Sequence, residues 1–577
     1  MKRLYFLTLL ACLSAGVSAQ NSARITGNLQ TNGNFFVRDS IIGAANTPQY
    51  DYQKYGAESW LNLNYSNWGF DIGVRFDVFH QSNIPNPTES YTQQGIGRWF
   101  VSKQIHNLNI AGGYIYDQIG SGIIFRAYEE RALFIDQALY GVRLGYKLND
   151  NWSVKAFTGR QKQQFSTYST VAHGAAVEGF IKPDSTGTFS IAPGCGVVAR
   201  TYDKPMIDRI LAEQSSLPLA DQVGAQYNTY AMTLYNTLSA GNFTWYFEGA
   251  YKTKDVIYDL NAPLISGGTG RFRNSDGYTV YNSFSYSGKG LGVTLESKLT
   301  KDFSFRVNPY ERGIQGPMNF LPVMAKQNTY RLATRFQPAV QELGEQAVQF
   351  DVRYALDKKW TVGLNMSGIA DYDGSILEGE NWFREIYPEV TYKYSRKGQA
   401  IVGVQFLRYN EQVYQNKGGI VNAVTPTFEY LYKFTPRRSV RVEAQYLHTK
   451  EEFGSWANML VEVGVAPHWV FYVSDMYKIP HTSKEKTDIR ESFGKVADSI
   501  NPPLTPEKRE AFVEEGLAGK TRYDNIHFFS AGAVFTQKSN RFALAYVKQV
   551  EGINCAGGIC RYEPTFHGVR LNVNSSF

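Results

Sequence analysis

Residues 347–367 read AVQFDVRYALDKKWTVGLNMS and have the pattern of a complete β-hairpin. Two alternating runs flank a tight polar turn, LDKKW, which begins at Leu356. Apolar side chains take one face: Val348, Phe350, Val352, Tyr354, Leu356, Trp360, Val362, Leu364 and Met366. Polar side chains take the other: Gln349, Asp351, Arg353, Thr361, Asn365 and Ser367. Successive side chains of a strand point to opposite faces, so one face of this hairpin is aromatic-rich and free of charge, as contact with lipid requires.

The same design recurs along the chain. Residues 24–37 (RITGNLQTNGNFFV) and 428–446 (FEYLYKFTPRRSVRVEAQY) alternate in the same way, and tight turns such as SNWG at Ser66 and QKSNR at Gln537 join many strand pairs. Longer links lie between these pairs, the longest expected near Gln163–Gly224 and Lys478–Tyr523. Short turns at one end and long loops at the other are typical of transmembrane β-barrels. We therefore predict an all-β, antiparallel transmembrane barrel of about 24 strands (roughly 20–26), with short periplasmic turns and long extracellular loops.

The last ten residues, GVRLNVNSSF, alternate through Val569, Leu571 and Val573 and end on Phe577. A final strand with a terminal aromatic resembles the signal by which the outer-membrane assembly machinery recognises its clients. We expect that machinery and outer-membrane lipid as partners. A large secreted sandwich or propeller would also alternate, but its solvent face would carry charges freely, and a propeller would show an internal repeat.

The first residues, MKRLYFLTLLACLSAGVSAQ, have the pattern of an export signal. Lys2 and Arg3 precede a short apolar run, and Val17-Ser18-Ala19 suits a signal-peptidase site. We expect a signal peptide over residues 1–19 and a barrel over residues 20–577, located in the outer membrane of a Gram-negative bacterium. A lipoprotein signal cut at Cys12 is the rival. A first strand near Arg24 would leave no room for an N-terminal domain that plugs the barrel.

Composition and motifs narrow the function. The chain carries a formal net charge of +7 and 15% aromatic residues, with no basic tract that would indicate nucleic-acid binding. No G-x-S-x-G, H-E-x-x-H or P-loop motif occurs, so we expect no enzymatic activity, no cofactor and no metal. An outer-membrane hydrolase remains an alternative, with His448 near Glu451 and Glu452. The segment NCAGGIC has the spacing for a disulfide between Cys555 and Cys560, which leaves Cys195 unpaired.

One stretch interrupts the alternation. Residues 116–148 read YDQIGSGIIFRAYEERALFIDQALYGVRLGYKL and combine glycines, apolar clusters and four closely spaced charges. This stretch resembles the characteristic segment of an uncharacterised, porin-like family of Bacteroidota-type outer-membrane β-barrels. The resemblance implies a location and a fold, and it assigns no catalytic or ligand residues.

The same stretch is too apolar for a solvated loop and too charged for lipid contact. We expect it to fold into the barrel, where a one-turn helix would pair Arg126 with Glu129 or Glu130. The predicted lumen constriction is Arg126, Glu129, Glu130 and Arg131. An external loop packed on its neighbours is the alternative.

Charges on the polar strand faces should line the lumen, because lipid excludes them. The candidates are Arg75, Arg143, Arg331, Arg335, Arg353 and Arg441. A surplus of such cations would favour anions. Helices are expected in two long links, at KPMIDRILAEQ from Lys204 and at PLTPEKREAFVEEG, with Thr505 as N-cap and Pro506 at the first position. The pattern favours a porin-like channel or uptake protein for small solutes. The alternative is a non-enzymatic barrel subunit of an outer-membrane secretion or assembly complex, bound to other outer-membrane proteins.

Overall fold

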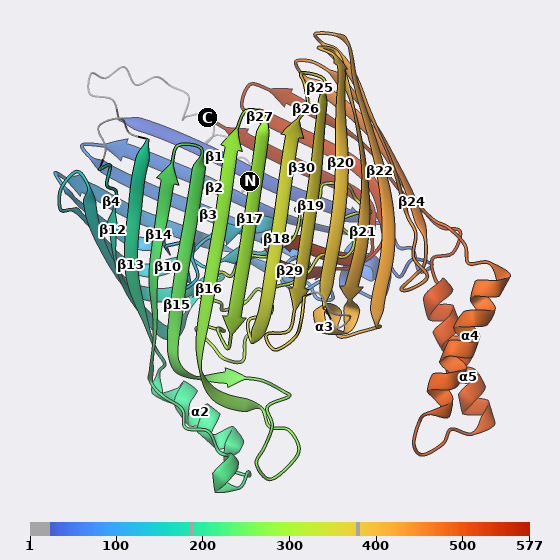
Figure 1. Ribbon diagram of the computed structural model, residues 1–577, viewed down its shortest axis with the longest axis horizontal. Helices are drawn as coiled ribbons and strands as arrows, with labels where there is room; N and C mark the ends of the chain where they lie inside the picture. The colour runs from blue at the N-terminus through green and yellow to red at the C-terminus, as the bar shows by residue number, and fades with distance from the viewer. Residues whose placement is uncertain (1–22, 184–187, 377–380) are drawn as a thin grey trace, which may run out of the picture.

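In the computed structural model, which describes residues 23–183, 188–376 and 381–577, the chain forms one closed antiparallel barrel of 24 strands (Figure 1). This confirms the predicted fold class and strand number. The barrel strands are β1 (Arg24–Phe36), β2 (Tyr55–Asn67), β3 (Phe70–Ser82), β4 (Tyr91–Ile105), β5 (Leu108–Ile115), β10 (Leu139–Lys147), β11 (Trp152–Gln163), β12 (Ser166–Gly179), β13 (Phe189–Thr201), β14 (Asn228–Ala240), β15 (Phe243–Tyr258), β16 (Phe272–Gly288), β17 (Leu291–Lys301), β18 (Gly344–Ala355), β19 (Trp360–Ala370), β20 (Phe383–Ser395), β21 (Gly398–Asn410), β22 (Ile420–Thr435), β23 (Arg438–Leu447), β24 (Trp456–Val465), β25 (Trp469–Lys478), β26 (His527–Gln537), β27 (Asn540–Gln549) and β30 (Phe566–Ser576).

The first and last strands close the cylinder. β1 pairs with β2 on one side and with β30 on the other. Backbone hydrogen bonds join Gly27 and Phe577 in both directions, at 2.8 and 3.0 Å. Every barrel strand therefore has two partners, and no sheet edge is left to face lipid.

The two ends of the barrel differ. Tight turns join β2 to β3, β14 to β15 and β26 to β27 at one end, which we call the short-turn end. The opposite, long-loop end carries the helices α2 (Lys204–Gln214), α3 (Glu411–Gln415), α4 (Ser483–Asp498) and α5 (Pro506–Thr521). α2, α4 and α5 project beyond the strands (Figure 1). The expected long link over Gln163–Gly224 is wrong, because the strands β12 and β13 lie within it and the long connection begins only after Thr201.

Short elements complete the fold. The two-residue strands β6 (Gln118–Ile119), β7 (Phe125–Arg126), β8 (Glu129–Glu130) and β9 (Ile135–Asp136) lie between β5 and β10, with the 3₁₀ turn η2 (Arg131–Leu133). β28 (Gly552–Ala556) and β29 (Ile559–Glu563) form a separate hairpin between β27 and β30. The remaining turns are η1 (Gln49–Gln53) and η3 (Leu219–Asp221).

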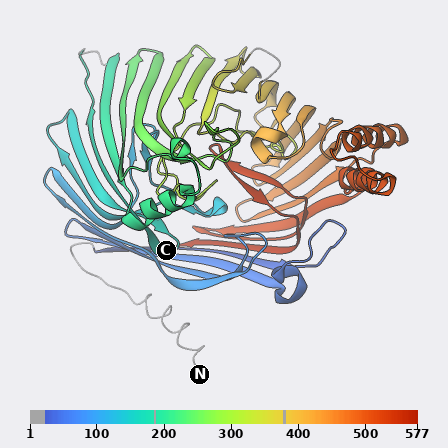
Figure 2. The same cartoon turned by 90° about the horizontal axis from the view of Figure 1, so that it is seen from below.

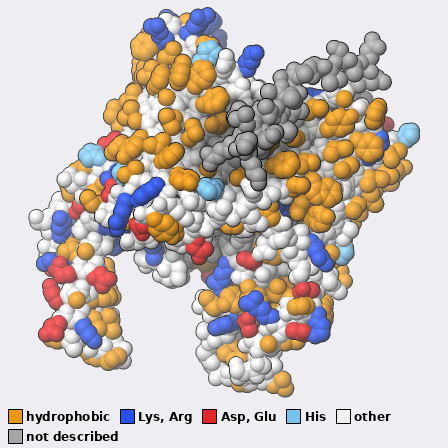
Figure 3. All heavy atoms as spheres, turned by 180° about the vertical axis from the view of Figure 1, so that it is seen from behind, with side chains coloured by type: hydrophobic (Ala, Val, Ile, Leu, Met, Phe, Trp, Pro, Cys, Tyr) orange, Lys and Arg blue, Asp and Glu red, His pale blue; other side chains and the backbone are white. Residues whose placement is uncertain are grey.

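The outer face of the wall is apolar. Figure 3 shows hydrophobic side chains spread over it, while charged side chains gather on the projecting parts at the lower end. In the hairpin of residues 347–367, Phe350 lies opposite Met366 and Val352 opposite Leu364. Met366 is 42% exposed, whereas Ser367 on the alternate face is 4% exposed. Such a surface is unfavourable in water and suits the hydrocarbon core of a membrane.

We expect Val352→Arg to reduce the free energy of unfolding by roughly 2–4 kcal/mol, since it places a cation in the apolar belt. The matched variant Gln349→Arg should change it little, because residue 349 pairs with Glu296 on the inner face. Urea unfolding in lipid vesicles measures both. Equal losses at the two positions would contradict the assignment of faces.

None of the helices among the described residues has the length and apolarity that a membrane-spanning helix needs. The expected signal peptide of residues 1–19 and the rival Cys12 lie outside the described residues.

Candidate functional site: the occupied lumen

Three segments of the chain lie inside the ring of strands (Figure 2). We call residues 116–138 the inner segment, residues 302–343 the plug loop, and Gly552–Glu563 the disulfide hairpin. Backbone hydrogen bonds join them: Arg126 N–H donates to Met318 O at 2.9 Å, and Phe320 N–H donates to Gly122 O at 2.9 Å. Val340 N–H donates to Gly558 O at 3.1 Å. The plug loop thus contacts both other segments.

Apolar side chains of the plug loop and of the inner segment pack together in one buried cluster. Its most buried side chains, each at most 1% exposed, are Phe303, Phe305, Val307, Met318, Met324 and Leu332. Ile123 and Ile124 of the inner segment belong to the same cluster and are fully buried. Because about 25 cal/mol is gained per Å² of apolar surface buried, this cluster holds the loop in one folded arrangement.

Polar contacts attach the plug loop to widely separated parts of the wall. Lys252 Nζ of β15 donates to Ser304 O at 2.7 Å. On β21, Gln405 Nε2 donates to Ala333 O at 3.1 Å. Beyond β23, Arg335 binds both carboxylate oxygens of Glu452 at 2.9 Å. The loop therefore crosses the lumen and is held at both sides.

Arg75, on the inner face of β3, is the centre of a buried charge network. Its guanidinium contacts Asp77 on the same strand at 2.6 Å, Glu129 at 2.7 Å and Asp136 at 2.8 Å. Arg75 is 2% exposed, so this charge is stable only because carboxylates surround it. Burial would raise the pKa of Asp136, but Lys162 and Arg75 outweigh burial and hold it below its ordinary value. The network attaches the inner segment to the wall.

The four predicted constriction residues all lie in the inner segment, but they have different partners. Arg131 Nε contacts Glu129 at 2.8 Å, and the Glu130 side chain caps the 3₁₀ turn by accepting from Ala132 N–H. The expected helix with Arg126–Glu129 or Arg126–Glu130 pairs is wrong. Arg126 instead stacks on the rings of Phe320 and Tyr128, with its Cζ 4.1 and 4.5 Å from their centroids. Phe320 belongs to the plug loop and is distant in the sequence, so the residues around Arg126 alone could not indicate this cation–π contact.

Besides Arg75, three of the predicted lumen charges lie on strands. Arg143 of β10 contacts Asp117 at 2.6 Å. Arg441 of β23 contacts Glu443, and also Glu429 and Glu462 at 3.4 and 3.3 Å. Arg353 of β18 lies 3.9 Å from Asp351, and its side chain is 61% exposed.

Arg331 and Arg335 do not lie on a strand, contrary to the sequence-based assignment. Both belong to the plug loop, whose local alternation imitates a strand but has no ladder partner there. Arg335 is paired with Glu452. The Arg331 guanidinium has no hydrogen-bond or ion-pair partner among the described residues.

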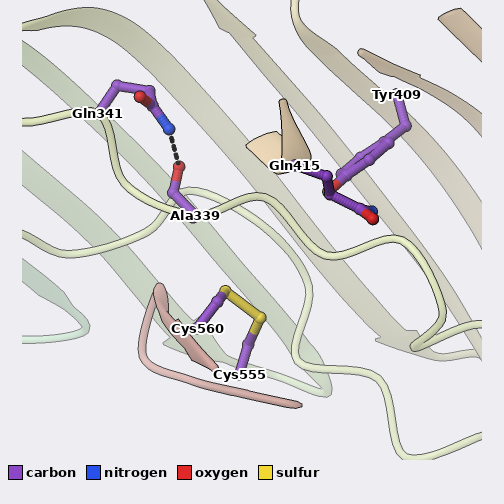
Figure 4. Close-up of a disulfide and its surroundings, with 6 residues drawn as sticks. All are labelled: Ala339, Gln341, Tyr409, Gln415, Cys555 and Cys560. Atoms are coloured by element: carbon purple, nitrogen blue, oxygen red, sulfur yellow. Dashed lines mark hydrogen bonds between the residues drawn. A yellow bond between two sulfur atoms is a disulfide. The ribbon is translucent and has the colours of Figure 1, made fainter. Parts of the chain in front are cut away.

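The disulfide hairpin lies close to the plug loop (Figure 4). Cys555 and Cys560 pair directly across its two strands and are joined by a disulfide. The tight turn at Gly557 and Gly558 has positive φ angles of 58° and 84°. A side chain at Gly558 would collide with Val323 and Val340, so the close approach requires glycine. Cys195, on β13, is a free and exposed thiol.

Two polar chambers remain around these segments. One, of about 340 Å³, lies between β13, β15, the plug loop and the disulfide hairpin, and its lining includes Arg306, Arg312 and Glu342. The other, of about 270 Å³, lies against β1, β2 and β30, and Arg131, Arg561 and Arg570 contribute to its lining. Both volumes are near the lower limit for pockets that hold small molecules.

The alternative hydrolase site is not assembled. His448 Nδ1 lies 3.1 Å from Ser455 Oγ, and Glu452 binds Arg335 instead. Glu451 accepts a hydrogen bond from Thr449. Within the described ranges, no group of three or more His, Cys, Asp or Glu side chains is placed to hold a metal ion.

Comparisons with known proteins give one family and several barrels. A model of a family of unknown function, DUF6029, matches residues 1–577. No curated protein matches. Among solved structures, the siderophore receptor PirA from Pseudomonas aeruginosa is 7% identical with a TM-score of 0.41, over 97% of this chain and 81% of that one. The P pilus usher (PapC) translocation pore is 8% identical with a TM-score of 0.41, over 96% and 99%. The outer membrane channel DcaP of Acinetobacter baumannii is 13% identical with a TM-score of 0.28, over 68% and 100%.

Proposed function

The chain belongs to DUF6029, a family of unknown function, and we propose that it is an integral outer-membrane barrel that admits small solutes through a lumen occluded at rest by its own loops. The apolar outer wall supports the membrane location. Orientation follows from the usual arrangement of such barrels, with the short-turn end in the periplasm and the long-loop end outside.

One observation carries the proposal: polar and ionic contacts fix the plug loop to the wall at widely separated points. The interaction of Arg335 with Glu452 and the hydrogen bond of Gln405 to Ala333 O are examples. Water can replace such contacts when the loop moves, so displacement costs less than unfolding an apolar core of the same size. A displaced plug loop would expose a lumen lined by strand residues of both charges, such as Arg441 and Glu429.

Voltage-driven opening in planar bilayers tests this gating. We expect Arg335→Gln to increase the frequency of opening, because it removes one attachment of the plug loop to the wall. Glu452→Arg should do the same. The double exchange, Arg335→Glu with Glu452→Arg, should restore the parent frequency, since it re-forms the pair with reversed charges.

The matched control is Arg353→Gln, which removes an exposed guanidinium whose one described ion pair, with Asp351 of the same strand, is weak. Unchanged gating in both single variants at position 335 and position 452 would argue against the plug loop as the moving part.

A second candidate, a barrel subunit of a secretion or assembly complex, is favoured by the helical pair α4–α5. The two helices pack on each other through Phe493 and Phe512 and through the ion pair Arg490–Glu514 at 2.6 Å. They project from the barrel, where a partner protein could bind them (Figure 3).

Purification in mild detergent separates the two candidates. A stoichiometric partner that is lost on deleting residues 483–521 would support the subunit role. A barrel that purifies alone and conducts would support the solute channel.

A further inference from the structure

Three guanidinium groups in the lumen have no carboxylate within ion-pair distance among the described residues. Arg331 of the plug loop, Arg561 of the disulfide hairpin and Arg570 of β30 form no ion pair with any described residue. Arg561 donates one hydrogen bond, to Asn83 O at 3.3 Å, and Arg570 donates one to Gln549 Oε1 at 3.1 Å. These single contacts leave most of the five donors of each guanidinium without a described partner.

Arg331 is opposed by nearby cations, whereas Arg561 and Arg570 lie near the carboxylate of Glu563. Burial, followed by the neighbouring guanidinium groups of Arg335 and Arg570, lowers the pKa of Arg331 to about 10. Burial likewise lowers the pKa of Arg561. Like charges inside a barrel repel strongly, because little water screens them. A bound anion would relieve this repulsion.

The chamber of about 270 Å³ provides the space. Arg131, Arg561 and Arg570 line it. The remaining polar lining is Asn32, Asn34, Asn83, Asn554, Asn572, Glu58 and Glu563.

Both glutamates of the lining already have partners. Glu563 accepts hydrogen bonds from Asn554 at 3.0 Å and Gln549 at 3.4 Å. Glu58 accepts from Ser82 at 2.5 Å, and its second oxygen is buried without a partner. That oxygen can accept a hydrogen bond from a hydroxyl group of a ligand.

We propose that this chamber binds a small hydroxylated oxyanion, with Arg561 and Arg570 holding its carboxylate or phosphate group. The planar guanidinium fork matches the two oxygens of such groups, and asparagine side chains can bind hydroxyls. The proposal rests on the proposed function, for which it names the class of solute. It applies to the occluded state, so it is tested by binding and not by conductance.

Isothermal titration calorimetry of the full-length barrel in detergent provides the test, with inorganic phosphate and gluconate as probes and chloride as the reference. We expect both oxyanions to bind and chloride to have no comparable effect. Arg561→Gln and Arg570→Gln should each weaken oxyanion binding about ten- to a hundredfold, because charged hydrogen bonds are lost. Arg353→Gln is the matched control and should bind as the parent does.

Thermal unfolding without added oxyanion shows whether the variants fold. Arg561→Gln and Arg570→Gln should each unfold at a temperature close to that of the parent, since each guanidinium donates only one described hydrogen bond. Affinities that stay unchanged in both lumen variants, or a parent that responds to chloride as it does to phosphate, would overturn the proposal. If the oxyanions bind as expected but the barrel never conducts, the proposed channel function fails and the binding site stands.

Discussion

Deleting residues 304–341 is expected to convert the barrel into a permanently open pore with a single-channel conductance many times that of the parent. The deletion removes nearly all of the plug loop. Its ends are already side by side, because Asp302 N–H donates to Leu343 O and Phe303 N–H to Glu342 O, both at 2.9 Å. These bonds continue the β17–β18 ladder, so an asparagine-glycine turn can join the two strands without strain.

The barrel should still fold after this deletion, because every wall strand keeps both of its partners. The carboxylates left behind, Glu452 and Glu389, would face water in the widened lumen instead of Arg335 and Lys326. Planar-bilayer recordings measure the conductance. The matched control deletes residues 483–521, a segment of nearly the same length that forms α4 and α5 outside the barrel, and it should conduct as the parent does. An unchanged conductance in a folded 304–341 deletion would refute the role of the plug loop as the obstruction.

Arg75→Met is expected to reduce the free energy of unfolding by about 3–5 kcal/mol, the largest effect of any single substitution proposed for this chain. The side chain keeps its approximate volume but loses its charge. Asp77, Glu129 and Asp136 then lose their common partner inside the barrel. Buried carboxylates without a cation are far more costly than the original network.

The pH dependence of this loss has a definite sign. In the parent, Lys162 and Arg75 hold the pKa of Asp136 below its ordinary value, so its contribution is present above that value and is lost as pH falls through the lowered pKa. Without Arg75, much of the contribution of Asp136 to the free energy of unfolding is missing at neutral pH. The difference in the free energy of unfolding between the parent and Arg75→Met should therefore become smaller below about pH 4. Urea unfolding in vesicles across this range measures it, with Arg353→Met as control. A deficit of under 1 kcal/mol at neutral pH would show that the network does not hold the inner segment.

The barrel could be predicted because lipid imposes a regular pattern on every spanning strand. The alternation assigns Val352, Leu364 and Met366 to the outer face, and the structure places them there. The tight turns mark where the chain reverses direction in each hairpin. The helices α2 and α5 were also predictable, since Pro and a capping residue mark their starts. α4 was missed, although Thr482 and Glu485 form a capping box at its first turn.

The plug loop was not predicted, and the reason is physical. Around Arg331 and Arg335 it alternates much as a strand does, and the property that excludes it from the wall is the lack of a hydrogen-bonded neighbour. A ladder partner is a long-range property that alternation does not report. A local signal was present in Pro309, Pro317 and Pro322, since proline is poorly tolerated inside a paired strand. Similarly, Arg126 finds its ring partner Phe320 only once two distant segments meet.

Both ends of the plug loop continue into barrel strands, β17 and β18, and under the proposed gating this attachment sets the kinetics of opening and closing. A separate inhibitor that left the lumen would diffuse away, and its return would depend on its concentration. The plug loop is attached to the wall at both ends, so after displacement it remains at a high local concentration near its position in the lumen. Its return is therefore a first-order process. The time that the barrel spends unoccluded is then a property of the single chain, the same at any density of protein in the membrane.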